Sequence, residues 1–98
     1  MNYSIKTQNC IQHFNISELN ELPVGCYHLF NEFGDFVKNH NLIISDDKIY
    51  LLTSFNHRLD EELLSQLKLI NPSINEVNFN GHPADYNLWI ENTTEESY

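Results

Sequence analysis

The chain has 98 residues, which is enough for one domain and too few for two. It carries 14 acidic and 5 basic side chains, for a formal net charge of −9, and 41% of its residues are hydrophobic. That hydrophobic fraction favours a packed core over disorder, while the charge repels nucleic-acid phosphates and anionic membranes. We therefore expect no direct nucleic-acid binding, no membrane contact, and a basic protein as the natural partner.

The N-terminal residues and the two cysteines indicate the cellular compartment. No basic stretch followed by an apolar one opens the chain, so we predict no signal peptide. The apolar runs are far shorter than a membrane span. These features predict a cytoplasmic protein, in which Cys10 and Cys26 stay reduced.

The first predicted elements are a strand and a short helix. Polar and apolar residues alternate over residues 3–8, which is the period of a strand, and residues 11–14 extend or follow it. Ser17 can cap a short helix over residues 17–22. Pro23 ends that helix.

Two hairpins are predicted in the middle of the chain. Residues 26–30 are apolar and aromatic, residues 31–35 contain the turn residue Gly34, and Phe36 and Val37 return. A second hairpin joins residues 42–44 to residues 49–53 through a polar turn over residues 45–48. The central part of the chain is therefore predicted to be a β-sheet.

One long helix is predicted over residues 59–70. Leucines 59, 63 and 67 recur every fourth residue and Ile70 follows, so one face of the helix is apolar. Ser54 or Asn56 can cap it. Pro72 stops it.

Two further strands close the predicted fold. Residues 74–80 place Val77 and Phe79 on one face, residues 81–85 form a turn, and residues 86–91 alternate again. We predict one α+β domain over residues 1–92 and a polar acidic tail over residues 93–98. Its antiparallel sheet has five to six strands, including the two hairpins, with the long helix packed on one face and the short helix near the N-terminus.

Acidic side chains cluster at the predicted turns and helix start. Turns and helix N-termini favour such residues for local reasons. Alternatively, they form an anionic face that docks where a partner's lysines and arginines bind phosphates, with an aromatic anchor beside it. The candidate partner-binding residues are Glu32, Asp35, Asp46, Asp47, Asp60, Glu61, Glu62, Trp89 and Glu91.

Cysteine and histidine residues offer an alternative site. The sequence contains four side chains of the types that bind zinc: Cys10, His13, Cys26 and His28. Residues 26 and 28 share one face of a predicted strand. The spacing of the four residues differs from that of zinc ribbons and fingers. No GxSxG, HExxH, Walker or GxGxxG motif occurs, so we assign no catalytic residue, metal or cofactor.

A short pattern resembles the GIY-YIG nucleases, in which two tyrosine-bearing strands precede an arginine on a helix. It consists of residues 25–27, residues 49–52 and Arg58. The second motif lacks its glycine, the gap between the motifs is too long, and the acidic charge opposes DNA binding. We therefore do not assign the chain to this family.

The preferred hypothesis is a non-enzymatic acidic protein that inhibits or modulates a basic, nucleic-acid-processing partner. Phage-encoded anti-restriction and anti-CRISPR inhibitors are examples of this class by size and charge. One alternative is a metal-binding module or small enzyme that uses the Cys and His residues. Another is a homodimeric scaffold that pairs through an exposed edge strand.

Overall fold

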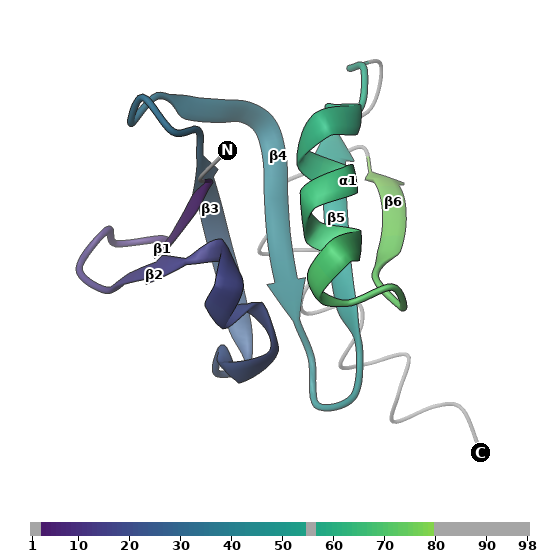
Figure 1. Ribbon diagram of the computed structural model, residues 1–98, viewed down its shortest axis with the longest axis horizontal. Helices are drawn as coiled ribbons and strands as arrows, with labels where there is room; N and C mark the ends of the chain where they lie inside the picture. Colours follow the sequence, from purple (N-terminus) through teal and green to yellow (C-terminus); the bar gives the residue numbers. More distant parts are fainter. Residues whose placement is uncertain (1–2, 55–56, 80–98) are drawn as a thin grey trace.

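The computed structural model describes residues 3–54 and 57–79 and shows a small α+β domain with one mixed sheet. The sheet order is β2-β1-β3-β4-β5-β6 (Figure 1). The elements are β1 (Ser4–Thr7), β2 (His13–Asn15), the 3-10 helix η1 (Ile16–Glu21), β3 (Gly25–Phe30), β4 (Phe36–Ile44), β5 (Ile49–Ser54), α1 (Glu61–Ile70) and β6 (Asn75–Phe79).

The two predicted central hairpins are confirmed in part, since both exist but share one long strand, β4, where the sequence predicted two separate strands. This strand pairs antiparallel with β3 on one side and with β5 on the other. Between the pairs Phe30–Phe36 and His28–Asn41, β4 contains more residues than β3. Strand β4 therefore bulges and bends at this point (Figure 1). Asn39 within the bulge has a φ of 64°, a left-handed conformation that asparagine tolerates better than most residues.

The prediction of a wholly antiparallel sheet is wrong at its last described strand. Strands β1 to β5 pair antiparallel, but β6 pairs parallel to β5, with Leu52 opposite Val77. The cause is α1, because a helical crossover returns the chain to the end of the sheet where β5 began. The shared face of Val77 and Phe79 is confirmed, since both pack with Ile43 and Leu52.

Both predicted helices exist, with different starts. The short one is the 3-10 helix η1, and its N-cap is Asn15 rather than the predicted Ser17, which lies within the helix. The Asn15 backbone N–H donates to the Glu18 carboxylate. The long one begins at Glu61 rather than residue 59, because Asp60 is its N-cap and accepts from the Leu63 N–H at 3.1 Å. It ends at Ile70, directly before Asn71 and Pro72, as predicted.

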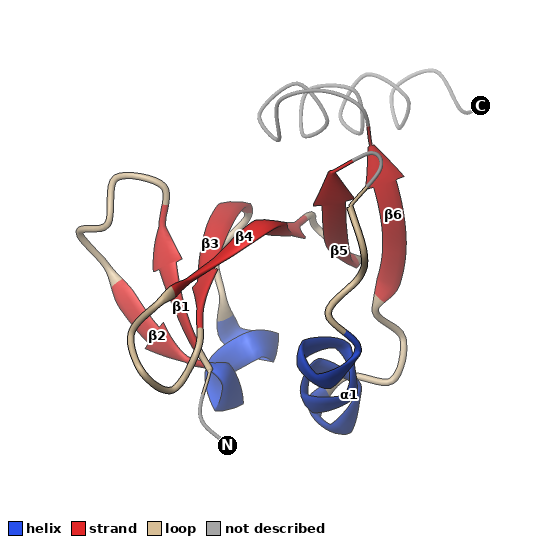
Figure 2. Ribbon diagram, turned by 90° about the horizontal axis from the view of Figure 1, so that it is seen from above, coloured by secondary structure: helices blue, strands red, loops and turns tan. Residues whose placement is uncertain are grey.

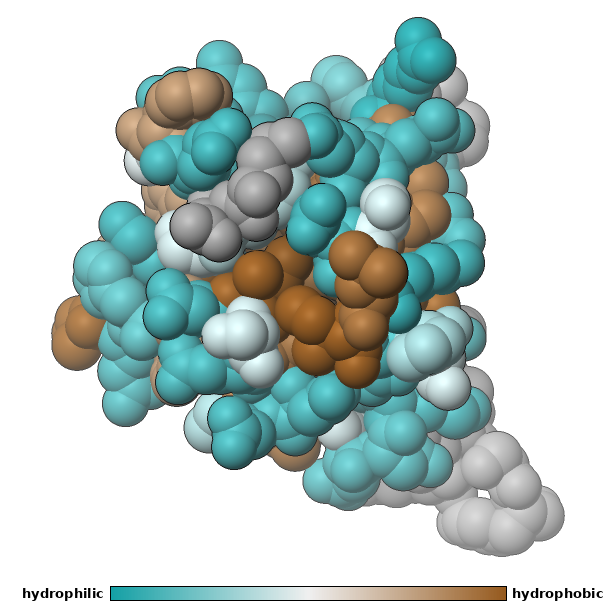
Figure 3. Space-filling model, viewed as in Figure 1, coloured by the Kyte–Doolittle hydropathy of each residue, from teal (hydrophilic) through white to brown (hydrophobic). Residues whose placement is uncertain are grey.

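The main core lies between the sheet and the two helices. Figure 2 shows η1 and α1 on the same side of the sheet, so the prediction that the long helix covers one face is confirmed. In Figure 3 apolar side chains gather near the centre of this side, surrounded by hydrophilic ones. The fully buried members of the core are Ile5, Leu19, Leu29, Leu42, Leu51, Leu63 and Leu67. Within residues 3–54 and 57–79, no helix is long and apolar enough to cross a membrane.

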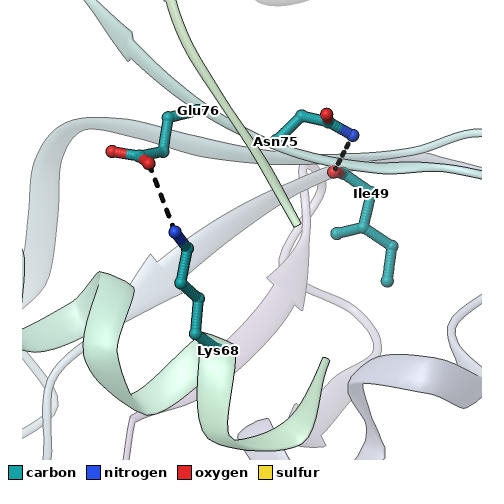
Figure 4. A network of polar contacts seen from close by, with 4 residues as sticks. All are labelled: Ile49, Lys68, Asn75 and Glu76. Atoms are coloured by element: carbon teal, nitrogen blue, oxygen red, sulfur yellow. Dashed lines mark hydrogen bonds and ion pairs between the residues drawn. The ribbon is translucent and has the colours of Figure 1, made fainter. Parts of the chain in front are cut away.

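Polar contacts hold β6 beside its neighbours (Figure 4). Lys68 of α1 forms an ion pair of 3.5 Å with Glu76 of β6. Asn75 donates from Nδ2 to the Ile49 carbonyl at 3.3 Å. The ion pair is half-exposed and contributes little by itself, so these contacts chiefly align β6 and α1.

The predicted strand over residues 86–91, the turn over residues 81–85 and the acidic tail over residues 93–98 lie outside the described residues. The same is true of Asn56, one of the two residues proposed to cap the long helix. The other, Ser54, is the last residue of β5.

His40 links the bend of β4 to the start of α1, and it is 4% exposed. Its Nδ1 lies 2.8 Å from the Lys38 carbonyl, and its Nε2 lies 2.9 Å from the Asp60 backbone nitrogen. A carbonyl only accepts and a backbone N–H only donates, so the ring is the neutral tautomer with its proton on Nδ1.

We predict that His40→Leu lowers the free energy of unfolding by about 1–3 kcal/mol. The substitution keeps apolar bulk but leaves the Asp60 N–H without its acceptor, and an unsatisfied, partly buried donor costs about that much. Urea denaturation followed by circular dichroism measures the change. His13→Leu, at an exposed position of β2, is the control and should change stability by less than about 0.5 kcal/mol. Equal effects of the two substitutions would contradict the assigned role of His40.

Candidate functional site

Five of the predicted partner-binding residues lie at one end of the sheet, which we call the acidic end. It consists of the β3–β4 turn and the first turn of α1, with Tyr3 just before β1. The pairing of Ser4 with Phe30 brings the start of β1 beside the end of β3, and α1 follows the end of β5, so the β3–β4 turn and the start of α1 lie at the same end of the sheet (Figure 1). The acidic residues of the acidic end are Glu32, Asp35, Asp60, Glu61 and Glu62.

The electrostatics of Tyr3 show that carboxylates from both segments act on one place. The Tyr3 side chain is buried, and this burial is the largest cause that raises the pKa of its phenol above the ordinary value. The negative charges of Asp60, Glu62 and Glu32 raise the pKa further, in that order. The β3–β4 turn and the start of α1, although far apart in sequence, therefore both place negative charge near Tyr3.

Asp60 has a structural role within the acidic end. Its carboxylate caps α1 through the Leu63 N–H, and its own backbone N–H binds His40. Glu61 and Glu62 occupy the first turn of the helix, where the helix dipole favours negative charge. The local explanation of acidic helix starts thus applies to all three residues, and the exposed carboxylates of Glu61 and Glu62 are also available to a partner.

The β3–β4 turn is held in one conformation by Asn31. Its side-chain Oδ1 accepts from the backbone N–H groups of Phe33 and Asp35, each at 2.9 Å. Its backbone N–H donates to the Asp35 carbonyl and its carbonyl accepts from Gly34. Gly34 has a φ of 83°, which glycine adopts readily. These bonds pre-organise the turn.

The turn presents an aromatic side chain to solvent. Phe33 is 80% exposed, between Glu32 and Asp35 in sequence. At the base of the turn Phe30 and Phe36 are paired across the strands, with ring centroids 5.6 Å apart. Phe33 is a functional candidate that the sequence reasoning missed. The available signal was a phenylalanine placed between an acidic residue and a turn glycine, where no strand face could bury it.

The remaining predicted partner-binding residues do not join the acidic end. Asp46 and Asp47 are exposed in the β4–β5 turn at the opposite end of the sheet (Figure 1). Trp89 and Glu91 lie outside the described residues. The acidic clusters that the structure describes therefore form two separate regions rather than one face.

The Cys and His residues proposed as zinc ligands lie on the two sides of β1. Lys6 pairs with His13 of β2 and with His28 of β3, and so stands between the two imidazoles on one face of the sheet. Among the residues that the structure describes, no group of three or more Cys, His, Asp or Glu is placed to hold a metal ion. Cys10, His13, Cys26 and His28, all of which are described, do not form such a group.

Neither cysteine is part of a disulfide, and Cys26 is not an activated nucleophile. Burial raises the pKa of the Cys26 thiol to about 11, and a backbone hydrogen bond from Tyr27 offsets this only in part. The thiol is thus protonated at neutral pH, whereas the thiolate is the nucleophilic form.

Comparisons of the chain with protein-family models, with curated proteins and with solved structures found no match. The functional proposal below therefore depends on the geometry of the site.

We predict slow, base-dependent alkylation of Cys26. Because the pKa of the Cys26 thiol is about 11, about one Cys26 side chain in a thousand is ionised at pH 8. Iodoacetamide should therefore alkylate Cys26 slowly at this pH in a Cys10→Ser variant. The rate should rise about tenfold per pH unit up to pH 10, as the ionised fraction rises. Mass spectrometry gives the rate, and Cys26→Ser, which retains the exposed Cys10, is the control. Rapid alkylation of Cys26 below pH 7 would show an activated thiolate and would support the enzyme hypothesis.

Proposed function

We propose that this protein is a small, non-catalytic binding module that inhibits or modulates a basic, nucleic-acid-processing partner. The acidic end is the docking surface. The observation that carries the proposal is the pre-organised β3–β4 turn, which exposes Phe33 between Glu32 and Asp35. This role is of the kind that phages direct against host defence complexes.

The aromatic residue and the carboxylates contribute in different ways. An exposed aromatic ring buries a large apolar area in a partner's pocket, so such residues dominate many interfaces. The surrounding carboxylates complement lysines and arginines, which raises the association rate and selects a basic surface. Because Asn31 already fixes the turn, little conformational entropy is lost on binding.

The net charge of −9 supports the choice of partner. A negatively charged surface competes with nucleic acid for basic sites that otherwise bind phosphates. We also propose that the protein acts in the cytoplasm, where the free thiols of Cys10 and Cys26 stay reduced. A pull-down from the native cell at low and high salt, with nucleic acid as competitor, tests the proposal. Binding that resists salt and is unaffected by nucleic acid would contradict it.

We predict that Phe33→Ala weakens binding to the recovered partner at least tenfold. The expected loss follows from removing an aromatic anchor, which typically costs about 2 kcal/mol or more. Isothermal titration calorimetry measures the affinity. Leu69→Ala is the matched control, because Leu69 is 76% exposed on α1 and should leave binding unchanged. If the two variants bind equally well, Phe33 is not the anchor.

We predict that Glu32→Gln and Glu62→Gln each reduce the salt dependence of association. Each removes one of the charges that act on Tyr3, and rim charges mainly change association rates. Stopped-flow kinetics between about 50 and 300 mM salt, a range over which screening changes strongly, gives the slopes. Glu21→Gln removes the same charge from the exposed last residue of η1 and is the control. Identical slopes for all three variants would mean that only net charge matters and would exclude docking through the acidic end.

A further inference from the structure

A cavity of about 460 Å³ lies at the opposite end of the sheet from the acidic end. It is formed where η1, the β4–β5 turn, the loop after α1 and the start of β6 come together. Its volume falls within the range of small-molecule sites, about 300–1,000 Å³. None of the residues of the acidic end lines this cavity.

The floor of this cavity is apolar and rigid. Leu19, Leu22 and Ile44 line it, and all three are buried members of the main core. Ile49, at the start of β5, completes the apolar lining. The close packing of these three side chains holds the apolar side of the cavity in place, and the half-buried Ile49 is its more accessible apolar group.

Hydrogen bonds of three asparagine side chains connect the segments around the cavity opening. Asn71 donates to the Asn20 Oδ1 at 2.9 Å, and Asn20 donates to the Ile70 carbonyl at 3.3 Å, which joins η1 to the end of α1. Asn75 donates from Nδ2 to the Ile49 carbonyl (Figure 4), so the oxygen of that amide remains an acceptor on the lining. The opening is therefore largely preformed, which lowers the entropy lost on binding.

The charged lining belongs to the β4–β5 turn. Asp46, Asp47 and Lys48 all line the cavity, so its charged lining has two carboxylates and one ammonium group. The turn is closed by Ser45, whose backbone N–H and hydroxyl both donate to the Lys48 carbonyl, at 2.9 and 3.1 Å. The carboxylates are not needed to hold this turn, so they can accept hydrogen bonds from a ligand.

We propose that this cavity binds an alkyl guanidinium group, with its methylene stem on the apolar floor and its charged head at Asp46 and Asp47. A guanidinium is planar, weakly hydrated and carries five donors that match carboxylate oxygens, whereas an ammonium is a compact, strongly hydrated charge. The ligand is either an arginine side chain of another protein or a free small molecule. The site is independent of the acidic end, and so of the proposed function.

The test is a titration of the wild-type protein, followed by ¹H–¹⁵N NMR, with N-acetyl-arginine methylamide and its citrulline counterpart. Citrulline has the same shape without the charge. We expect the arginine probe to shift the amide signals of residues 45–49, 71 and 73–75, and the citrulline probe to bind about tenfold more weakly. Equal binding of the two probes, or shifts confined to residues 31–35 and 60–62, would overturn the proposal.

The variant Asp46→Asn/Asp47→Asn should reduce arginine-probe binding about tenfold while the dispersion of the spectrum shows an intact fold. Asp35→Asn/Glu61→Gln removes the same number of charges at the acidic end and should retain probe binding at the cavity. Unchanged binding by the first variant would overturn the assignment of the carboxylates.

Two further probes distinguish the sources of the ligand. Agmatine represents a free small molecule, and an arginine within a short extended peptide represents a protein side chain. Binding of agmatine alone, or tighter than the peptide, supports a free ligand, and tighter binding of the peptide supports a protein side chain. Binding of neither would overturn the site, without bearing on partner capture through Phe33.

Discussion

The apolar contact between the sheet and α1 is the constraint on which the other features depend. Leu63 and Leu67 of the helix are fully buried in one cluster with Leu42 and Leu51 of the central strands. Burial of side chains of this size stabilises a fold by about 1.5–3 kcal/mol each. Because the helix must lie along the sheet to make this contact, the chain returns to the start of β5, and β6 can only pair parallel to it.

The position of α1 also determines the chemistry of the two ends of the sheet. Its N-terminus brings Asp60 and Glu62 to the end where Glu32 lies, and their charges converge on the buried Tyr3. Its C-terminus brings Asn71 to Asn20, which closes the rim of the cavity beside the β4–β5 turn. One helix thus completes the proposed docking surface at one end and the proposed small-ligand site at the other.

Polar groups in this domain fix particular segments. His40 ties the bulge of β4 to the start of α1, and Asn31 fixes the turn that carries Phe33. In both cases a side chain satisfies backbone groups that regular secondary structure leaves unpaired. Such contacts set the direction of a segment, while the apolar core supplies the driving force for folding.

Local patterns in the sequence were enough to predict the α+β class, the turns of both central hairpins, the apolar face of the long helix and the position of its end. These features depend on neighbouring residues: the period of apolar side chains, the turn glycine at position 34 and Pro72. Local pattern also located acidic residues at turns and at a helix start. It did not identify Phe33 as exposed, because a phenylalanine within a hairpin is equally compatible with burial.

Only the tertiary structure decided which distant residues meet. It placed Glu32 with Asp60 and Glu62 and separated them from Asp46 and Asp47, whereas the sequence offered all of these as candidates for one surface. It kept Cys10, His13, Cys26 and His28 from forming a metal-binding group, and it gave β6 its parallel direction. The physical reason is that these outcomes depend on which strands become neighbours and on where α1 packs, and those long-range contacts leave no periodic signal in the order of residues.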